Sequence, residues 1–206
     1  MMDSGVGGLP YLEEAAALLP GERFVYLADR AGFPYGTKSR EEIESMVLNR
    51  VGCLVSRFNP KALVIACNTA SQAALAAARR AFPELPIVGT VPAIKPAAER
   101  TRSGVIGIMA TAHAIKDPYL DGLVARYASK VLVLREGAQD LVSFVENRFI
   151  DSSAEERRAA VYPEVSRFVA GGADEIVLAC THFLHVADDI EALASELAAK
   201  RAAREG

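Results

Sequence analysis

Two of the three cysteines stand in matching surroundings. Cys67 directly follows the apolar run LVIA and precedes Asn and Thr, whereas Cys180 follows the apolar run IVLA and precedes Thr and His. A thiol at such a place can act as a nucleophile or a metal ligand when it is deprotonated. Because the arrangement occurs twice, we interpret the two thiols as chemical groups rather than as core residues.

Other interpretations of the cysteines make different predictions. Free cysteine often packs as a small hydrophobic residue, and this is our interpretation of Cys53, which lies inside an amphipathic helical pattern. Cys67, Cys180 and His182 could bind zinc, but no CxxC or HxxxH spacing supports them, so we expect no metal. Cys180 and His182 could form a nucleophilic pair for acyl transfer, an interpretation that leaves Cys67 unexplained.

The glycine-rich stretch at 3–10, DSGVGGLP, resembles a dinucleotide-binding fingerprint, with Asp29 at the ribose-binding place. The fingerprint fails because Pro10 stands where the last glycine belongs and because two methionines are all that precedes Asp3. The helix expected after this loop still offers backbone N–H groups to a carboxylate. Alternatively, Asp3 or Ser4 only caps that helix.

The elements that must position these residues alternate in type along the chain. Apolar runs predict strands at 24–29, 62–66, 86–90, 104–110, 130–135 and 175–179. Helical patterns lie at 9–19, 40–58, 91–101, 141–149, 154–170 and 188–204. Another begins at 69 or 71 and ends at 82, and one more ends near 127. Continuous apolar strands between helices are typical of parallel sheets covered on both faces.

The fold class predicted from this alternation is α/β, with two similar lobes of mostly parallel sheet flanked by helices. We place the first lobe at 1–97 and the second at 98–185, with a C-terminal helix at 186–206. Ligands of parallel sheets bind at the carboxyl ends of the strands. Cys67 and Cys180 lie at such ends, one in each lobe, so we predict an active site in a cleft between the lobes.

Composition narrows the class of protein. The 206 residues are 51% hydrophobic, enough to bury a core, and carry a formal net charge of −3. No basic stripe favours nucleic acid as a partner. No apolar run reaches membrane-spanning length, and no signal peptide opens the chain, so we expect no membrane partner. Three cysteines do not form a disulfide framework, and we expect reduced thiols in the cytoplasm.

Five motifs, taken in order, resemble the glutamate racemases of the cofactor-independent aspartate/glutamate racemase family. They are DSGVGGL, FPYG, ACNTA, the strand and turn GVIG…AT, and ACTHF, and they span nearly the whole chain. The resemblance implies two α/β lobes with the active site between them. It also implies that no cofactor is used, that glutamate is the small-molecule substrate, and that the D-glutamate formed serves peptidoglycan synthesis.

The resemblance assigns roles to individual residues. Cys67 and Cys180 are implied to be two acid/base thiols, with Asp3 and His182 as their polar partners. The implied substrate contacts are Asp3, Ser4, Tyr35, Gly36, Asn68, Thr69, Thr111, Thr181 and His182. Inversion at a carbon needs a base on one face and an acid on the other. Thiols suit this task, since their ordinary pKa of about 8.5 lies near neutral pH.

The chain also departs from the family's pattern. We expect the N-terminal strand of the first lobe to be missing. We also expect the C-terminal helix to return toward that lobe. A homodimer would compensate for missing strands. Ile108 stands where the family usually has Thr, and THFLHV lacks the usual aromatic residue and Pro after the His. Two alternatives therefore stay open, an aspartate racemase of the same family and a shortened amino-acid-binding protein without activity.

Overall fold

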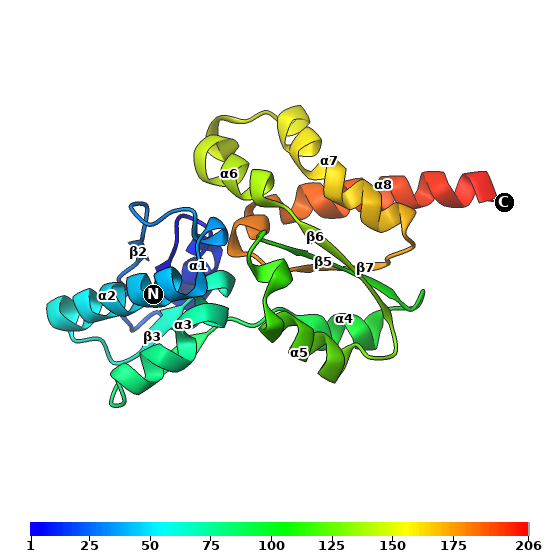
Figure 1. Ribbon diagram of the computed structural model, residues 1–206. Helices are drawn as coiled ribbons and strands as arrows, with labels where there is room; N and C mark the ends of the chain where they lie inside the picture. The colour runs from blue at the N-terminus through cyan, green and yellow to red at the C-terminus, as the bar shows by residue number, and fades with distance from the viewer. Residues whose placement is uncertain (206) are drawn as a thin grey trace. The chain divides into compact units, whose positions relative to one another are not determined.

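The computed structural model describes residues 1–205, which form two compact units (Figure 1). The first unit is Met1–Val91, and the second begins at Pro92. The sequence placed this division later, between residues 97 and 98. The difference arises because helix α4 (Ile94–Arg100) packs against α5 (Pro118–Tyr127) and β7 (Glu175–Leu178), both of which belong to the second unit.

The first unit is built on a parallel sheet with the strand order β2-β1-β3-β4. Its strands are β1 (Met2–Asp3), β2 (Leu27–Ala28), β3 (Leu63–Ile65) and β4 (Ile87–Gly89). We expected the N-terminal strand to be missing, whereas Met2 and Asp3 form one in the middle of the sheet. Two residues suffice because both neighbours hold them: Ala66 N–H donates to Met2 O (2.8 Å) and Asp29 N–H donates to Asp3 O (2.9 Å).

Three helices and one short 3₁₀ helix complete the first unit. They are α1 (Leu9–Leu18), η1 (Tyr35–Thr37), α2 (Arg40–Phe58) and α3 (Asn68–Ala81). The capping box predicted at the start of α2 is confirmed: Glu42 N–H donates to Ser39 Oγ, and Ser39 N–H donates to the Glu42 carboxylate. The buried side of α2 carries Ile43, Val47, Val51 and Leu54 at helical spacing.

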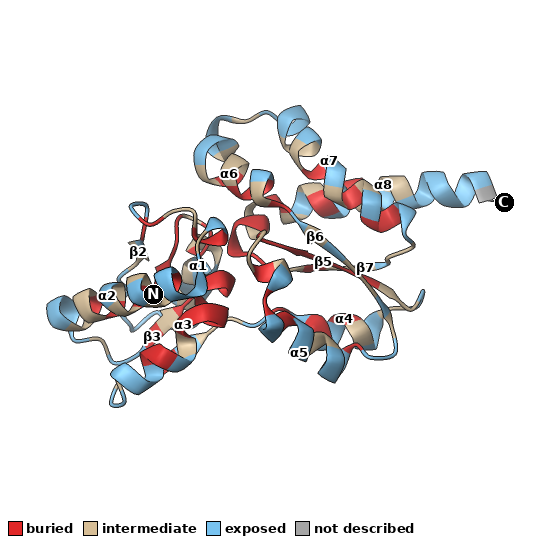
Figure 2. Ribbon diagram, in the orientation of Figure 1, coloured by how far each residue is buried: buried red, intermediate tan, exposed pale blue. Residues whose placement is uncertain are grey.

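Helix α3 lies close to the sheet along its N-terminal half, which Figure 2 shows as buried. Small alanine side chains at this end allow the close approach. The helix begins at Asn68, one residue earlier than the first of the two starts that we predicted. The reason is that Cys67 acts as the cap, since its sulfur accepts a hydrogen bond from Ala70 N–H (3.4 Å).

The second unit is built on a parallel sheet with the strand order β6-β5-β7, with β5 (Val105–Ala110) between β6 (Leu132–Gly137) and β7. Helices α4 and α5 cover one face of it, and α7 (Ala154–Ala170) and α8 (Ala187–Glu205) lie on the other (Figure 1). The remaining elements are η2 (Ala114–Lys116), α6 (Gln139–Arg148), η3 (Phe149–Asp151) and η4 (Thr181–Val186).

The return of the last helix toward the first lobe stays a prediction. In the structure α8 belongs to the second unit and packs along α7. Two ion pairs join the helices, Arg157 to Asp189 (3.1 Å) and Arg158 to Glu196 (2.8 Å).

The predicted fold class is confirmed: both sheets are parallel and flanked by helices. All six predicted strands are present, although the first is limited to Leu27 and Ala28. No helix within residues 1–205 has the length and hydrophobicity needed to span a bilayer.

Candidate active site

In the first unit, Asp3 and Cys67 lie at the carboxyl ends of neighbouring strands, because Asp3 ends β1 and Cys67 comes shortly after β3. Met2 in β1 is paired with Ile65 in β3, so both chains leave the sheet at the same edge. Asp3 is fully buried, and its Oδ1 accepts a hydrogen bond from Gly5 N–H (2.9 Å). Ser4 Oγ lies 3.4 Å from Asp3 Oδ1 and 3.8 Å from Cys67 Sγ. The serine hydroxyl therefore connects the carboxylate to the thiol.

The surroundings of Cys67 favour the protonated thiol. Burial, followed by the negative charge of Asp3, raises the pKa of Cys67 to about 12. Hydrogen bonds from Ala70 N–H and from Ser4 act in the opposite direction. At neutral pH this group therefore holds its proton and is placed to donate it.

Asn68 and Thr69 form the first turn of α3 directly after the thiol, and both are buried. Asn68 Oδ1 has no hydrogen-bond partner among residues 1–205. Buried amide oxygens are nearly always paired, so this atom is suited to a bound polar group. The N–H groups of the first helical turn also favour an anion.

Tyr35 and Gly36, at the start of η1, are also buried in the first unit. The Tyr35 hydroxyl donates to Asp29 Oδ2 (2.7 Å). Burial first, and then this bond to Asp29, raises the pKa of Tyr35, and the charge of the Cys67 thiolate acts in the same direction. Tyr35 is thus a neutral phenol close to the thiol. Asp29, weighed above as a ribose-binding residue, is instead the partner of this tyrosine.

In the second unit, Cys180 and Thr111 follow the adjacent strands β7 and β5. Ala179 N–H donates to Met109 O (2.8 Å), which continues the pairing of the two strands to their ends. Both side chains are buried at this edge of the sheet. Thr111 Oγ1 accepts a hydrogen bond from Ala114 N–H (3.1 Å), and Cys180 precedes η4, whose first residue is the buried Thr181.

A buried row of three side chains runs from Cys180 through His182 to Glu146. His182 Nδ1 lies 3.8 Å from Cys180 Sγ, and His182 Nε2 lies 2.9 Å from Glu146 Oε2. The side chains of His182 and Glu146 are 1% and 3% exposed. A carboxylate at this distance can accept a hydrogen bond from Nε2, and Nδ1 is the ring nitrogen nearer the sulfur.

Sequence reasoning missed Glu146. It lies on α6, far along the chain from the motifs that contain Cys67 and Cys180. The residues next to it in the sequence include charged and amide side chains, so it resembled an exposed helical residue. The apolar positions Leu141, Val142 and Val145 mark the buried face of this helix. Glu146 directly follows that face, which is the signal that could have identified it.

Comparison with known proteins identifies the family. A family model described as Asp/Glu/Hydantoin racemase matches residues 11–198 of this chain. The chain belongs to this family. The match confirms the resemblance inferred from the five motifs, and membership makes the chain an amino acid racemase, which is an isomerase.

Individual members of the racemase family extend the similarity. The chain is 49% identical over 199 residues to a glutamate racemase of Sphingopyxis alaskensis, covering 92% of this chain and 71% of the relative. It resembles the structure of Escherichia coli glutamate racemase in complex with L-glutamate and the activator UDP-MurNAc-Ala (TM-score 0.83, 35% identity, 92% and 71% covered). It also resembles the Francisella tularensis glutamate racemase in complex with D-glutamate (TM-score 0.75, 25% identity, 92% and 70% covered).

Other interpretations of the cysteines can now be compared with the racemase structure. Cys53 lies on α2 and is partly buried, and none of the three cysteines forms a disulfide within residues 1–205. Within the described part of the chain, no group of three or more His, Cys, Asp and Glu side chains could hold a metal ion.

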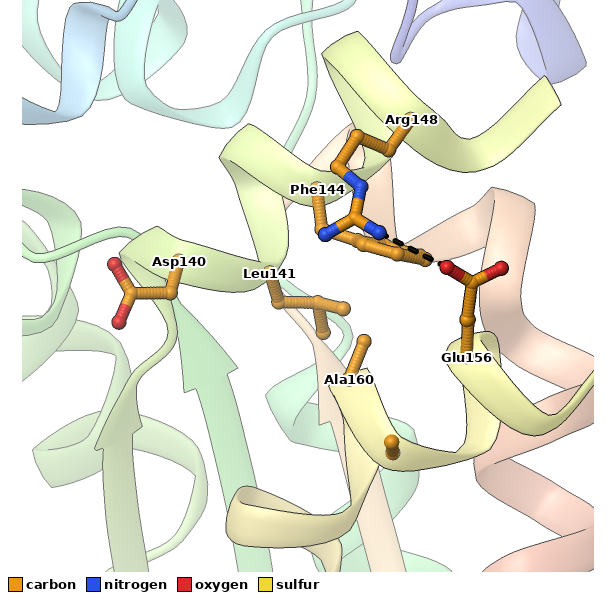
Figure 3. A pocket seen from close by; sticks show the side chains of 7 residues that line it. Asp140, Leu141, Phe144, Arg148, Glu156 and Ala160 are labelled. Atoms are coloured by element: carbon orange, nitrogen blue, oxygen red, sulfur yellow. Dashed lines mark hydrogen bonds and ion pairs between the residues drawn. The ribbon is translucent and has the colours of Figure 1, made fainter. Parts of the chain in front are cut away.

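A pocket of about 330 Å³ lies between α6 and α7 in the second unit (Figure 3). Its lining residues are Asp140, Leu141, Phe144, Arg148, Glu156, Ala159 and Ala160. Arg148 and Glu156 form an ion pair across it (2.9 Å). The lining includes none of the predicted site residues, so this pocket is separate from the row of Cys180, His182 and Glu146.

The raised pKa of Cys67 predicts how this thiol reacts with iodoacetamide. Thiolates are the reactive form, so alkylation of Cys67 should keep rising with pH beyond pH 9 instead of reaching a plateau there. Asp3→Asn removes a negative charge that raises the pKa, so Cys67 should react faster in this variant at pH 9. Peptide mass spectrometry at a series of pH values measures the rate. A plateau below pH 9 in the unchanged protein would contradict the prediction.

Proposed function

We propose that this racemase interconverts L- and D-glutamate without a cofactor, using Cys67 and Cys180 as the two acid/base groups. The observation that carries the proposal is the pair of buried thiols, each at the carboxyl end of a parallel strand and each beside a polar partner. The names of the relatives and the glutamate bound in two of the similar structures support this substrate.

The reaction requires one thiol on each face of the α-carbon. One sulfur, as thiolate, takes the α-proton, and the electron pair left on the carbon is delocalised into the neighbouring carboxylate. The other sulfur, as thiol, gives its proton to the opposite face, which forms the new C–H bond with inverted configuration. The first thiolate has become a thiol and the second a thiolate, so the reverse reaction uses the same groups with their roles exchanged.

The first unit supplies the acid when Cys180 is the base. The Cys67 thiol holds its proton because it is buried beside Asp3. After Cys67 has given its proton away, Asp3 and Ser4 are close enough to help return one from solvent. General acid–base groups of this kind typically contribute about 10²–10⁴-fold to a rate.

The second unit supplies a base assisted by histidine. His182 Nδ1 faces the sulfur of Cys180 and can accept the thiol proton, which leaves a thiolate next to an imidazolium. The Glu146 carboxylate stabilises the positive charge on the ring. His182 is therefore a proton carrier in this mechanism, and Glu146 is a residue that positions it.

The remaining predicted residues would hold the substrate. Hydroxyl, amide and backbone N–H donors suit its two carboxylates, and they come from Ser4, Gly36, Asn68, Thr69, Thr111 and Thr181. The start of α3, whose first turn directly follows Cys67, is suited to one carboxylate. Such contacts orient the α-carbon for proton transfer.

We also propose that the D-glutamate formed is used for peptidoglycan and that the protein acts in the cytoplasm. The mechanism supports this location because both sulfurs must stay reduced, and reducing compartments keep thiols free. A homodimer remains a prediction, which the mass of the protein in solution can test.

The proposal is tested by adding purified protein to L-glutamate or L-aspartate without any cofactor and following optical rotation. We expect rotation to decay to zero with L-glutamate and to change far more slowly with L-aspartate. Faster decay with L-aspartate would make the chain an aspartate racemase. Binding of L-glutamate without any decay would identify the non-catalytic binding protein that the sequence left open.

A further inference from the structure

The Tyr26 hydroxyl is hydrogen bonded to both ends of the glycine-rich loop that follows Asp3 and contains Ser4. It donates to Gly5 O (2.8 Å) and accepts a hydrogen bond from Gly8 N–H (3.0 Å). A phenol has one proton to donate and lone pairs that accept. One side chain therefore serves a carbonyl and an N–H group that lie three residues apart in the loop, and the mechanism proposed above gives this side chain no role.

Gly5 connects this tyrosine to the Asp3 carboxylate. Gly5 N–H donates to Asp3 Oδ1 (2.9 Å), and Gly5 O accepts from the Tyr26 hydroxyl. The backbone of a glycine is freer than that of any other residue, so hydrogen bonds have to hold it in one conformation. The bond that orients Gly5 therefore also orients the N–H group that holds Asp3.

Gly8, at the other end of the loop, is packed tightly. A Cβ atom on Gly8 would lie 2.9 Å from both Tyr26 Oη and Ala66 Cβ. Contacts this short leave no room for a side chain, so Gly8 lies directly against the tyrosine and against the residue before Cys67. Gly8 also precedes α1, and an N–H group at this place has no partner within the helix. The tyrosine hydroxyl is the partner.

Tyr26 is itself held in place by the sheet of the first unit. It is partly buried and directly precedes β2. Leu27 N–H donates to Met1 O (3.0 Å), and Asp3 is paired with Ala28 one position further along. The hydroxyl therefore extends from an ordered part of the chain and can hold residues 4–8, which form neither helix nor strand.

We infer that Tyr26 is a positioning residue that keeps the Asp3 carboxylate and the Ser4 hydroxyl beside the Cys67 thiol. Ser4 Oγ lies 3.4 Å from Asp3 Oδ1 and 3.8 Å from Cys67 Sγ, and a small movement of the loop changes both distances. The consequence for catalysis rests on the proposed function, in which Asp3 and Ser4 help to return a proton to Cys67. Tyr26 acts through the backbone of the loop.

The test is the rate at which iodoacetamide alkylates the thiols of Tyr26→Phe at pH 9, measured by peptide mass spectrometry. Without the hydroxyl the loop is no longer tied at Gly5 and Gly8. Burial and the Asp3 charge, which raise the pKa of Cys67, then both act more weakly. Alkylation of Cys67 should be about 2- to 10-fold faster, because one pKa unit is worth tenfold in the thiolate equilibrium.

The other two cysteines are internal controls for a general loss of stability. Cys53 lies on α2 of the same unit, and Cys180 lies in the second unit. If Tyr26 only stabilised the first unit, Cys53 would react faster together with Cys67, because partial unfolding exposes both. A positioning role changes Cys67 alone. Tyr162→Phe removes a hydroxyl from an exposed position on α7 and should leave all three rates unchanged.

A double-mutant cycle shows whether Tyr26 acts through Asp3. In the Asp3→Asn background the carboxylate charge is already gone, so Tyr26→Phe should change the Cys67 rate by less than about 2-fold. For racemisation, Tyr26→Phe alone should lower kcat/KM by about 10-fold, the effect of roughly one hydrogen bond. Gly8→Ala crowds the same hydroxyl. It should also speed the alkylation of Cys67 alone, and it replaces Tyr26→Phe if that variant does not fold.

Three results would overturn the inference while the racemase activity itself stands: an unchanged Cys67 rate in Tyr26→Phe, an equal increase at Cys53, or an equal increase in both Asp3 backgrounds. An unchanged kcat/KM in Tyr26→Phe would overturn its catalytic consequence. If the unchanged protein does not racemise glutamate, the proposed function fails, and the alkylation rates still decide whether Tyr26 holds Asp3 beside the thiol.

Discussion

Cys67→Ala and Cys180→Ala are each expected to lower kcat/KM for glutamate racemisation by about 10²–10⁴-fold, the usual contribution of a general acid or base. We expect a loss in kcat/KM at the upper end of this range, because each thiol is proposed as the sole proton donor or acceptor on its face of the α-carbon. The two enantiomers have equal free energy, so the loss must be equal in both directions. Optical rotation from either enantiomer measures it.

Cys53→Ala is the matched control for the thiol variants. Cys53 lies on α2, is partly buried and has no role in the proposed mechanism, so turnover should be nearly unchanged. Circular dichroism should show that all three variants keep their fold, since an alanine replaces a side chain of similar size. Near-full activity in either Cys67→Ala or Cys180→Ala would refute the two-thiol mechanism.

His182→Gln is expected to cause the second-largest loss, within the same range of about 10²–10⁴-fold in kcat. Without the imidazole, Cys180 loses the group that faces its sulfur at 3.8 Å and accepts its proton. KM should change less than kcat unless His182 also holds substrate. A kcat that stays within a few-fold of the original value would show that His182 is not the proton carrier.

Glu146→Gln is the companion variant, because it keeps the shape of the side chain and removes its charge. The amide can donate to Nε2, which would leave the proton on Nδ1 and reverse the tautomer that faces Cys180. A kcat loss smaller than that of His182→Gln, with affinity for glutamate retained, is the expected outcome. In the His182→Gln background the same change should have little further effect, and full additivity would speak against the coupling.

The sequence predicted well those features that depend on neighbouring residues. The apolar runs before Cys67 and Cys180 placed both thiols at strand ends, and the spacing of Ser39 and Glu42 set the start of α2. The two-residue strand β1 was not predictable in this way. Met2 and Asp3 carry no strand pattern, and they are extended because β2 and β3 hydrogen bond to them from both sides.

The same distinction applies to the candidate site. Cys180 and His182 are two residues apart, so their proximity could be foreseen, whereas Glu146 reaches His182 from another helix. Arg50 and Asp29 meet because α2 packs beside the loop before η1. Each of these partners depends on tertiary packing, and charged residues within helical patterns are usually assigned to the surface.

The fate of the α-hydrogen in the early part of the reaction tests the two-thiol mechanism most directly. L-Glutamate is turned over in D₂O for a small fraction of one half-life, and the separated enantiomers are analysed by mass spectrometry. The sulfur that removes the α-proton then carries protium, while the opposite sulfur carries deuterium from solvent. We predict that the D-glutamate formed contains one α-deuterium and that the recovered L-glutamate stays largely unlabelled. Protium in the D-glutamate, or early labelling of L-glutamate comparable to that of the product, would contradict two thiols acting on opposite faces.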